Sequence, residues 1–321
     1  MPKSTAESKQ IEPSFKELPA TTGPYKHLPK GSVKDCLNCV LNFWGPIGLR
    51  AAIRYVMIET VESYRLEPII GKPDGSKLAG RILPLIQNKP ESIPVVQDSP
   101  KLGDDARFSL TVKNDSKYEN RHIYASEFAG APFACDGYIG TVDPGLTVTI
   151  VLKPVFGSMD GGRKNHVNAA SIKQENVGVL HPVHGGPSVY DYTPHRSHQR
   201  LTWTNQGWKG KVLISKVLSH MIASMQSIVE KTGYEPSIEP DSGIHNFILN
   251  FHDDRTAFLI CEYAHIVDPE IPFITFSVDN RAEPVIRVTE QFSPEQAADF
   301  VKKCASVCIE DLEKILDCVP K

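Results

Sequence analysis

Two pairs of histidines form the first pattern in the sequence that could do chemistry. His181 and His184 make one H-x-x-H spacing, and His195 and His198 make another. Imidazole is a frequent zinc ligand, and a zinc site needs three or four converging donors. These four histidines are therefore candidate metal ligands, although their spacing matches no familiar zinc signature and equally fits a solvated loop. We expect no cofactor, with a zinc ion at these histidines as the alternative.

Other reactive residues have simpler explanations. Cys36 and Cys39 have the C-x-x-C spacing of a zinc knuckle or a redox dithiol, but no second pair accompanies them. We expect both to be ordinary thiols within a helix, and Cys304 and Cys308 to lie on the apolar stripe of the last helix. The neighbouring carboxylates Asp253 and Asp254 fit a turn between two strands.

The chain contains none of the standard enzyme motifs. It has no nucleophile elbow, phosphate-binding loop, zinc-protease helix or dinucleotide-binding glycine pattern. No catalytic residue is assigned, and we expect a protein that is not an enzyme. A metal-dependent enzyme that uses the four histidines remains an alternative function.

Charge placement is the most informative feature of the sequence. The formal net charge of the 321 residues is −3, but residues 161–220 contain eight basic and two acidic residues, and residues 234–321 contain seven basic and 17 acidic residues. Their net charges are therefore +6 and −10. Aromatic and basic residues alternate with no carboxylate near the end of the cationic stretch, as in surfaces that stack bases and neutralise phosphates. The candidate residues for binding an anionic partner are Arg163, Lys164, Arg196, Arg200, Trp203, Trp208, Lys209 and Lys211.

Several partners would fit this basic-aromatic segment. Nucleic acid and an anionic membrane surface are two of them. The acidic C-terminal part of the same chain, or of a neighbouring copy, is a third, because opposite charges would orient such a contact. Trp203 and Trp208 would equally serve as core anchors.

The first third of the chain predicts an arm and a helical region. Residues 1–31 are polar and rich in Pro and Gly, which predicts a flexible arm. Ser32 and Asp35 resemble a capping box before a helix that Gly45-Pro46 ends. The segment from Leu49 to Leu66 fits a helix, but its β-branched residues would also suit a strand.

Between Pro94 and Pro154 the apolar pattern alternates with a period of two. Strands are expected around Phe108–Val112, His122–Ser126 and Thr147–Leu152, with a type II turn at Pro144-Gly145. The stretches FSLTVKND, which begins at Phe108, and GTVDPGLTVTIVLKP, which ends at Pro154, resemble the immunoglobulin-like sandwich of major sperm protein and similar domains. The resemblance covers about 50 residues and implies a β-sandwich. It carries over no functional residue.

The last third has the clearest element pattern. A helix is expected over Val212–Glu230 and another after the N-cap Ser293, with four strands between them at 244–251, 257–264, 273–278 and 285–289. Their short connections predict an antiparallel four-stranded sheet. Within the intervening irregular stretch, strands are expected at 177–180 and 201–204.

The sequence as a whole predicts an α+β protein in four parts. These are a flexible arm (1–31), a helical and immunoglobulin-like β-sandwich region (32–160), a cationic irregular segment (161–210) and a C-terminal α-β-β-β-β-α domain (211–321). With 40% hydrophobic and 23% charged residues, the composition is that of a globular protein and excludes a coiled coil or a wholly disordered chain.

We expect no secretory signal peptide. The N-terminus lacks the apolar core of a secretory signal, and no transmembrane segment is expected. Seven cysteines without a secretory route suggest reduced thiols, so we expect the cytoplasm or the nucleus.

These features favour a non-enzymatic structural or adaptor protein. We expect it to form homo-oligomers and to contact an acidic partner through its basic-aromatic segment. The architecture would also suit a viral structural or accessory protein, and a nucleic-acid-binding protein, most simply one that binds RNA, is the main alternative.

Overall fold

The structure is a computed structural model in which part of the chain is described. The described residues are 12–19, 37–69, 90–157, 173–176, 180–181, 189–190, 196–205, 207–230, 237–238, 245–248, 254–271, 274–278, 284–288 and 292–321. Helices and antiparallel sheets are both present, so the protein is of mixed α and β composition, as predicted.

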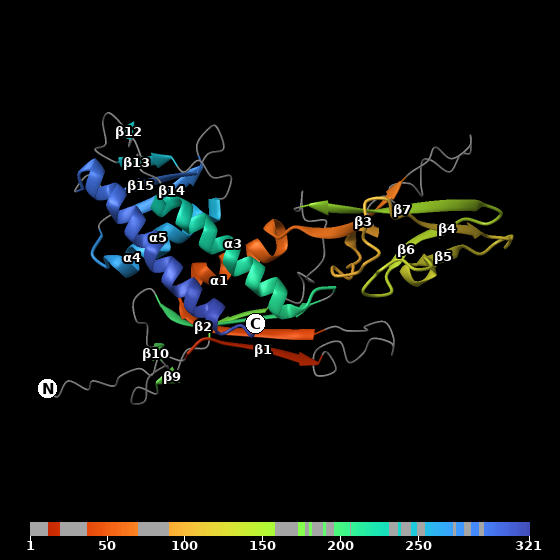
Figure 1. The fold of residues 1–321 in the computed structure, drawn as a ribbon, viewed down its shortest axis with the longest axis horizontal. Coiled ribbons are helices and arrows are strands. Elements are labelled where there is room, and N and C mark those ends of the chain that lie inside the picture. The colour runs from red at the N-terminus through yellow and green to blue at the C-terminus, as the bar shows by residue number, and fades with distance from the viewer. Residues whose placement is uncertain are drawn as a thin grey trace.

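The chain forms two lobes (Figure 1). In the larger lobe, helices lie between two antiparallel sheets. The first sheet has the order β1-β2-β11-β8 and contains β1 (Ser14–Pro19), β2 (Leu37–Gly45), β11 (Ser197–Asn205) and β8 (Lys173–Asn176). The second has the order β12-β13-β15-β14 and contains β12 (Ser237–Ile238), β13 (His245–Ile248), β15 (Pro284–Val288) and β14 (Ile274–Val278). The helices are α1 (Ile47–Tyr55), which a π-helical turn extends over Val56–Thr60, α3 (Gly210–Glu230), α4 (Asp254–Val267) and α5 (Pro294–Asp317).

The smaller lobe, called the β lobe below, consists of two antiparallel sheets. One has the order β3-β7-β4 and contains β3 (Ser63–Ile69), β7 (Thr147–Gly157) and β4 (Phe108–Lys113). The other pairs β5 (Arg121–Tyr124) with β6 (Tyr138–Val142). Short 3₁₀ turns occur at Pro90–Ser92 and Ala125–Glu127, and β9 (Leu180–His181) pairs with β10 (Val189–Tyr190) elsewhere in the chain.

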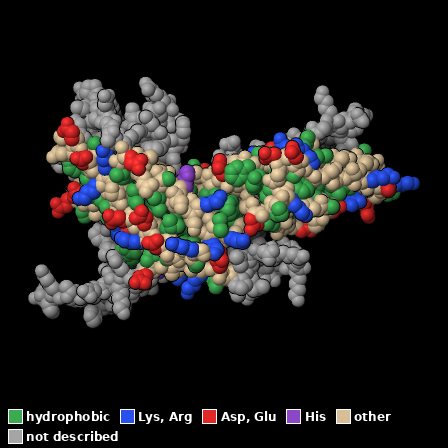
Figure 2. Space-filling model, viewed as in Figure 1, with side chains coloured by type: hydrophobic (Ala, Val, Ile, Leu, Met, Phe, Trp, Pro, Cys, Tyr) green, Lys and Arg blue, Asp and Glu red, His purple; other side chains and the backbone are tan. Residues whose placement is uncertain are grey.

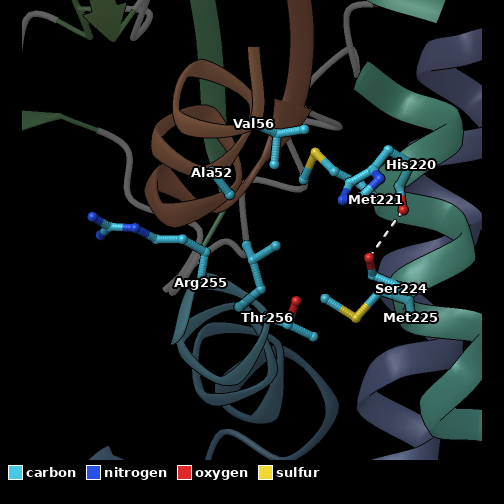
Figure 3. Close-up of a pocket in the computed structure, with 9 residues that line it drawn as sticks. Ala52, Val56, His220, Met221, Ser224, Met225, Arg255 and Thr256 are labelled. Atoms are coloured by element: carbon cyan, nitrogen blue, oxygen red, sulfur yellow. Dashed lines mark hydrogen bonds between the residues drawn. The ribbon is translucent and has the colours of Figure 1, made fainter. Parts of the chain in front are cut away.

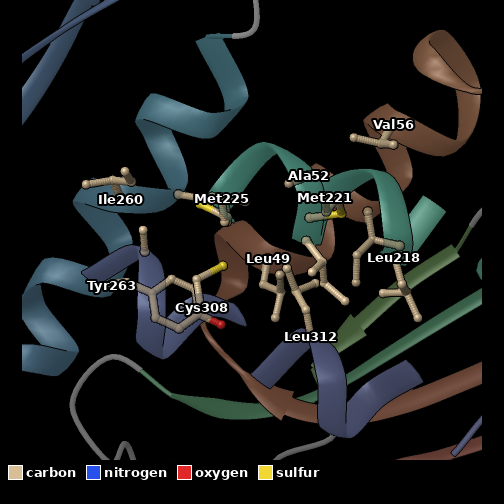
Figure 4. Packing of buried hydrophobic residues seen from close by; sticks show 14 of the residues in the cluster. Leu49, Ala52, Val56, Leu218, Met221, Met225, Ile260, Tyr263, Cys308 and Leu312 are labelled. Carbon is tan, nitrogen blue, oxygen red and sulfur yellow. The ribbon is translucent and has the colours of Figure 1, made fainter. Parts of the chain in front are cut away.

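Each lobe has its own hydrophobic core. The core of the larger lobe includes buried residues from positions 39–61 and from positions 201–319, so it joins the two ends of the chain. Figure 4 shows α1, α3, α4 and α5 meeting there, with Leu49, Met225 and Leu312 close together. The core of the β lobe contains residues from Leu66 to Leu152. Residues 32–160, which the sequence groups together, are therefore divided between the two cores.

The helix expected before Gly45-Pro46 is wrong, because residues 37–45 form β2; residues 32–36 lie outside the described residues. Cys39, Leu41 and Phe43 are fully buried, whereas Val40 and Asn42 between them are only half-buried. This alternation has the period of a strand. Strand β2 pairs with β1 on one side and β11 on the other, which buries every second side chain in the core.

The strand expected at 257–264 is also wrong, because this segment lies within α4. Its buried residues include Ala257, Ile260 and Ala264, which recur every three or four positions as on one face of a helix. Asp254 accordingly begins α4 rather than a turn, while Asp253 lies outside the described residues. The second sheet is still four-stranded and antiparallel, but its fourth strand is β12.

Two further segments are more regular than the sequence predicts. Within the expected arm, residues 14–19 form β1 and pair with β2; residues 1–11 and 20–31 lie outside the described residues. Within the expected irregular segment, β11 pairs with both β2 and β8. The ambiguous segment 49–66 contains both structures that its composition suits, since α1 and the π-helical turn precede β3.

Other expectations are confirmed. Gly145 has a φ of 73° and the Leu146 N–H donates to the Asp143 carbonyl (3.3 Å), so Pro144 and Gly145 occupy the centre of the expected turn. The strand expected around His122–Ser126 exists as β5, although it ends at Tyr124. It pairs with β6 and not with the strand at Phe108, which pairs with β7 as β4. Helix α5 begins with a capping box in which Ser293 accepts a hydrogen bond from the Gln296 N–H.

Helix α3 is long and apolar enough to cross a bilayer by length and composition, and no other helix within the described residues meets that criterion. In this fold its apolar face lies in the core of the larger lobe, where Leu213, Val217 and Ile228 are fully buried. The core helix of a globular domain satisfies the same criterion, so the helix is weak evidence for a membrane span.

Candidate functional site

Two arginines of the predicted basic-aromatic segment are bound to other residues of the same chain. The Arg196 guanidinium forms an ion pair with Asp311 of α5, with 3.1 Å between Nη2 and Oδ2. Arg200 donates from Nε to the Asn42 side-chain oxygen across the β2–β11 pair (2.9 Å). The Arg196–Asp311 pair is a direct contact between the cationic segment and the acidic C-terminal part of the chain.

Asp311 is the centre of a small polar network inside the larger lobe. Its side chain is only 5% exposed, and Tyr263 of α4 donates its hydroxyl proton to Oδ2 (3.0 Å). Burial raises the pKa of Asp311 above its ordinary value, while Arg196, Tyr263 and Lys314 act in the opposite direction. The network therefore links α4, α5 and the start of β11 through one carboxylate.

The two tryptophans of the segment have different environments. Trp203 is fully buried in β11, so its ring packs in the core and presents no face to a nucleic-acid base. Trp208 is half-buried, and the Lys216 ammonium lies 4.8 Å from its ring centroid. That distance is within cation–π range. Trp203 is thus a core anchor, and Trp208 supports a cation.

The remaining basic candidates lie near the start of α3. Lys209 forms an ion pair with Asp98 of the β lobe (3.2 Å), but both side chains remain about two-thirds exposed. Lys211 donates from Nζ to the carbonyl of Lys321 (2.9 Å). On the face that Figure 2 shows, Lys and Arg side chains are interspersed with Asp and Glu. Arg163 and Lys164 lie outside the described residues.

The histidine pairs are only partly placed by the structure. His198 is buried in β11 with 6% exposure. His181 belongs to β9, and His184 and His195 lie outside the described residues. In the part of the chain that the structure describes, no group of three or more His, Cys, Asp or Glu side chains is arranged to hold a metal ion.

The cysteines of β2 and α5 are buried in the core of the larger lobe. Cys39 is buried in strand β2, not in the expected helix, and Cys36 lies outside the described residues. Cys304 and Cys308 lie on the buried stripe of α5, as predicted. Burial raises the pKa of Cys304 to about 12 and that of Cys308 well above its usual range, so neither forms a thiolate readily near neutral pH.

A group of exposed aromatic residues in the β lobe escaped the sequence analysis. Ile123 and Ile139 are fully buried, so the alternate residues His122, Tyr124 and Tyr138 lie on the outer face of the β5–β6 pair. The Tyr138 ring meets His122 and Tyr124 edge to face, at centroid distances of 5.7 and 6.0 Å. We call these three residues the aromatic face. In the sequence, the apolar Ile123 between His122 and Tyr124 was the signal that these two side chains lie on the opposite face of a strand.

One cavity in the larger lobe is too small for a ligand. It lies between α1, α3 and α4, and Figure 3 shows His220, Met221, Ser224 and Met225 of α3 along one side, with Ser224 hydrogen-bonded to the His220 carbonyl (3.0 Å). Its volume of about 10 Å³ is close to the space of one water molecule.

Comparison with known proteins adds no family to these observations. No protein-family model matches the chain, and a search of curated proteins gives no significant match. Function must therefore be argued from the chain's own geometry.

Proposed function

We propose that this protein is a non-enzymatic structural or adaptor protein that self-associates. The observation that supports this best is the aromatic face of the β5–β6 pair. Tyr124 and Tyr138 are 41% and 36% exposed, yet their ring contacts already hold them in place. Tyrosine is enriched at the centres of protein interfaces, because it supplies a large contact area at a low entropy cost.

The position of the aromatic face also suits an interface. Strands β5 and β6 belong to the β lobe, whose core is separate from that of the larger lobe (Figure 1). A second copy could contact this face without disturbing either core. Contact between equivalent faces of two copies would form a two-fold symmetric dimer, which is the commonest arrangement of homo-oligomers.

Light scattering over a concentration series tests self-association. We expect the wild-type chain to form an oligomer and Tyr124→Ser/Tyr138→Ser to shift it towards the monomer. Tyr118→Ser is the matched control, since Tyr118 is 90% exposed in the same lobe but lies outside the aromatic face. A wild-type protein that is monomeric at every concentration would rule out the proposal.

We propose further that an acidic partner contacts the basic residues near the start of α3. Lys209 supports this, because its side chain is 68% exposed and its ion pair with Asp98 is of the weak surface kind. Lys211 is two residues further along the chain, and its ammonium donates to the Lys321 carbonyl. Arg196 and Arg200 contribute to the fold instead.

A salt series separates the two kinds of acidic partner that the segment could bind. Polyglutamate and a short single-stranded oligonucleotide serve as probes for the wild type and for Lys209→Glu/Lys211→Glu. We expect polyglutamate binding to weaken in the variant and with salt. Tighter binding of the oligonucleotide, with a steep salt dependence, would favour the nucleic-acid alternative. Lys113→Glu, an exposed lysine of the β lobe, is the control.

The β lobe has the features of a β-sandwich. We infer that the β lobe is an immunoglobulin-like sandwich, supported by a core that lies between the β3-β7-β4 sheet and the β5–β6 pair. A reducing compartment, cytoplasm or nucleus, is the location that the cysteine usage favours. Limited proteolysis that releases a stable fragment near residues 62–157 would support the sandwich as a unit.

A further inference from the structure

A second, larger cavity lies where the two lobes meet. Thr60, Val61 and Glu62 line it from the chain between the π-helical turn and β3, and Phe156 lines it from the end of β7. The opposite wall consists of Lys216 and His220 of α3. The volume is about 350 Å³, which is within the range of small-molecule sites. We call it the inter-lobe cleft.

The wall from α3 brings two basic side chains to the inter-lobe cleft. Lys216 and His220 are four residues apart on a helix, so they project from the same side. Both are exposed, and neither is buried in the core. The Lys216 ammonium lies 4.8 Å from the Trp208 ring centroid, which limits its freedom before any ligand arrives. Two adjacent donors of this kind suit an anionic group.

The wall from the β lobe supplies an aromatic ring. Phe156 is 50% exposed, although it belongs to a strand that otherwise contributes to a core. Its ring contacts the ring of Tyr64, the opposite residue on β3, at a centroid distance of 4.9 Å, which limits its freedom to move. A ring held in this way can stack against a planar ligand.

We propose that the inter-lobe cleft binds a small organic anion that carries an aromatic ring. The ring packs on Phe156, and the anionic group pairs with Lys216 and His220. Glu62 lines the same cleft, and its negative charge lowers the affinity for an anion. This site is independent of the proposed self-association, because it shares no residue with the aromatic face.

The simplest probe contains only the two groups that the inference needs. We choose 1-naphthyl phosphate, and measure its binding to the full-length protein by calorimetry and by the rise in melting temperature. We expect a dissociation constant of about 1 mM or tighter. Inorganic phosphate and 1-naphthol, which each carry one of the two groups, should bind at least about tenfold more weakly.

Substitutions in the inter-lobe cleft should act in opposite directions. Lys216→Gln and Phe156→Ala should each weaken binding about fivefold or more, because each removes one contact. Glu62→Gln should strengthen it, because it removes a like charge. All three side chains are exposed, so the variants should fold, and unchanged melting temperatures without ligand verify this. Lys303→Gln, an exposed lysine on α5 away from the cleft, is the matched control.

Three results would overturn the inference. The first is no saturable binding of 1-naphthyl phosphate at millimolar concentration. The second is binding that Lys216→Gln and Phe156→Ala leave unchanged, since the ligand would then lie elsewhere. The third is equal affinity for inorganic phosphate, which would show that the ring contributes nothing. None of these results bears on the oligomeric state, which the tyrosine variants test separately.

Discussion

At the scale of single residues, Arg196, a candidate for binding an anionic partner, instead forms an ion pair with Asp311 of the same chain. Asp311 is only 5% exposed, so its charge depends on Arg196, on the Tyr263 hydroxyl and on the more distant Lys314 ammonium (3.8 Å). Removing one partner of a buried pair leaves an uncompensated charge, which costs more than the pair itself contributes. Arg196 therefore acts mainly on stability.

We predict that Arg196→Met lowers the free energy of unfolding by about 2 to 3 kcal/mol near neutral pH. Urea denaturation measures this. Arg121→Met is the control, because Arg121 forms an exposed ion pair with Glu127 (2.8 Å) and its loss should cost less than about 1 kcal/mol. Adding Asp311→Asn to Arg196→Met should recover part of the lost stability.

The same pair predicts a pH dependence. The folded-state pKa of Asp311 is raised above 3.8, so the folded protein retains this proton to higher pH than the unfolded chain. Ionisation of Asp311 therefore lowers stability as the pH rises through the raised pKa. Arg196 opposes that loss, so the cost of Arg196→Met should be larger at about pH 7 than at about pH 4. A cost that is equal at both pH values would contradict this assignment.

At the scale of elements, the two lobes are joined by a short stretch before α3. The Gln97 N–H donates to the Gly207 carbonyl (2.8 Å), and the Gln97 side chain bonds both the N–H and the carbonyl of Tyr64 (2.6 and 3.0 Å). Gly207 has a φ of 79°, and a Cβ there would lie 2.1 Å from the Val95 carbonyl oxygen. Only glycine fits this approach without a backbone shift.

We predict that Gly207→Ala destabilises the junction by about 1 to 3 kcal/mol, because it combines backbone strain with a clash. Amide hydrogen exchange at Gln97 should accelerate, and the urea midpoint should fall. Gly103→Ala is the matched control, since a Cβ there meets no atom within 4 Å. If Gly207→Ala and Gly103→Ala give the same exchange rate at Gln97 and the same urea midpoint, the backbone at Gly207 can shift to accommodate a Cβ at little cost.

At the scale of the whole molecule, the separate cores suggest separate unfolding units. Leu152 lies in the core of the β lobe and Leu312 in that of the larger lobe, and both are fully buried. All three tryptophans, Trp44, Trp203 and Trp208, lie in the larger lobe or at its edge. Tryptophan fluorescence therefore reports on one core only.

We predict that Leu152→Ala weakens the β lobe by about 2 to 5 kcal/mol while leaving the tryptophan midpoint unchanged. Hydrogen exchange in β4 and β7 would report the loss. Leu312→Ala, a matched change in the other core, should lower the tryptophan midpoint. Equal shifts for both variants would mean that the lobes unfold as one unit.

Sequence patterning predicted the elements whose periodicity and end signals agree. The capping box at Ser293, the apolar stripe of α3 and the Pro144-Gly145 turn depend on local backbone geometry, which neighbouring residues determine. The mixed α and β class follows from these same local signals. Short apolar runs do not determine secondary structure by themselves, because residues such as Leu41 and Ile260 fit a helix or a strand until a partner element is known.

Tertiary structure decided what local signals could not. Residues 37–45 form a strand because β1 and β11 lie beside them, and β11 is more than 150 residues away in the sequence. Arg196, an expected binding residue, instead pairs within the chain with Asp311, 115 residues away. The inter-lobe cleft likewise joins Glu62, Phe156 and Lys216, whose only relation is spatial. Composition and spacing determined which side chains were available, whereas long-range packing decided which of them meet and which face the solvent.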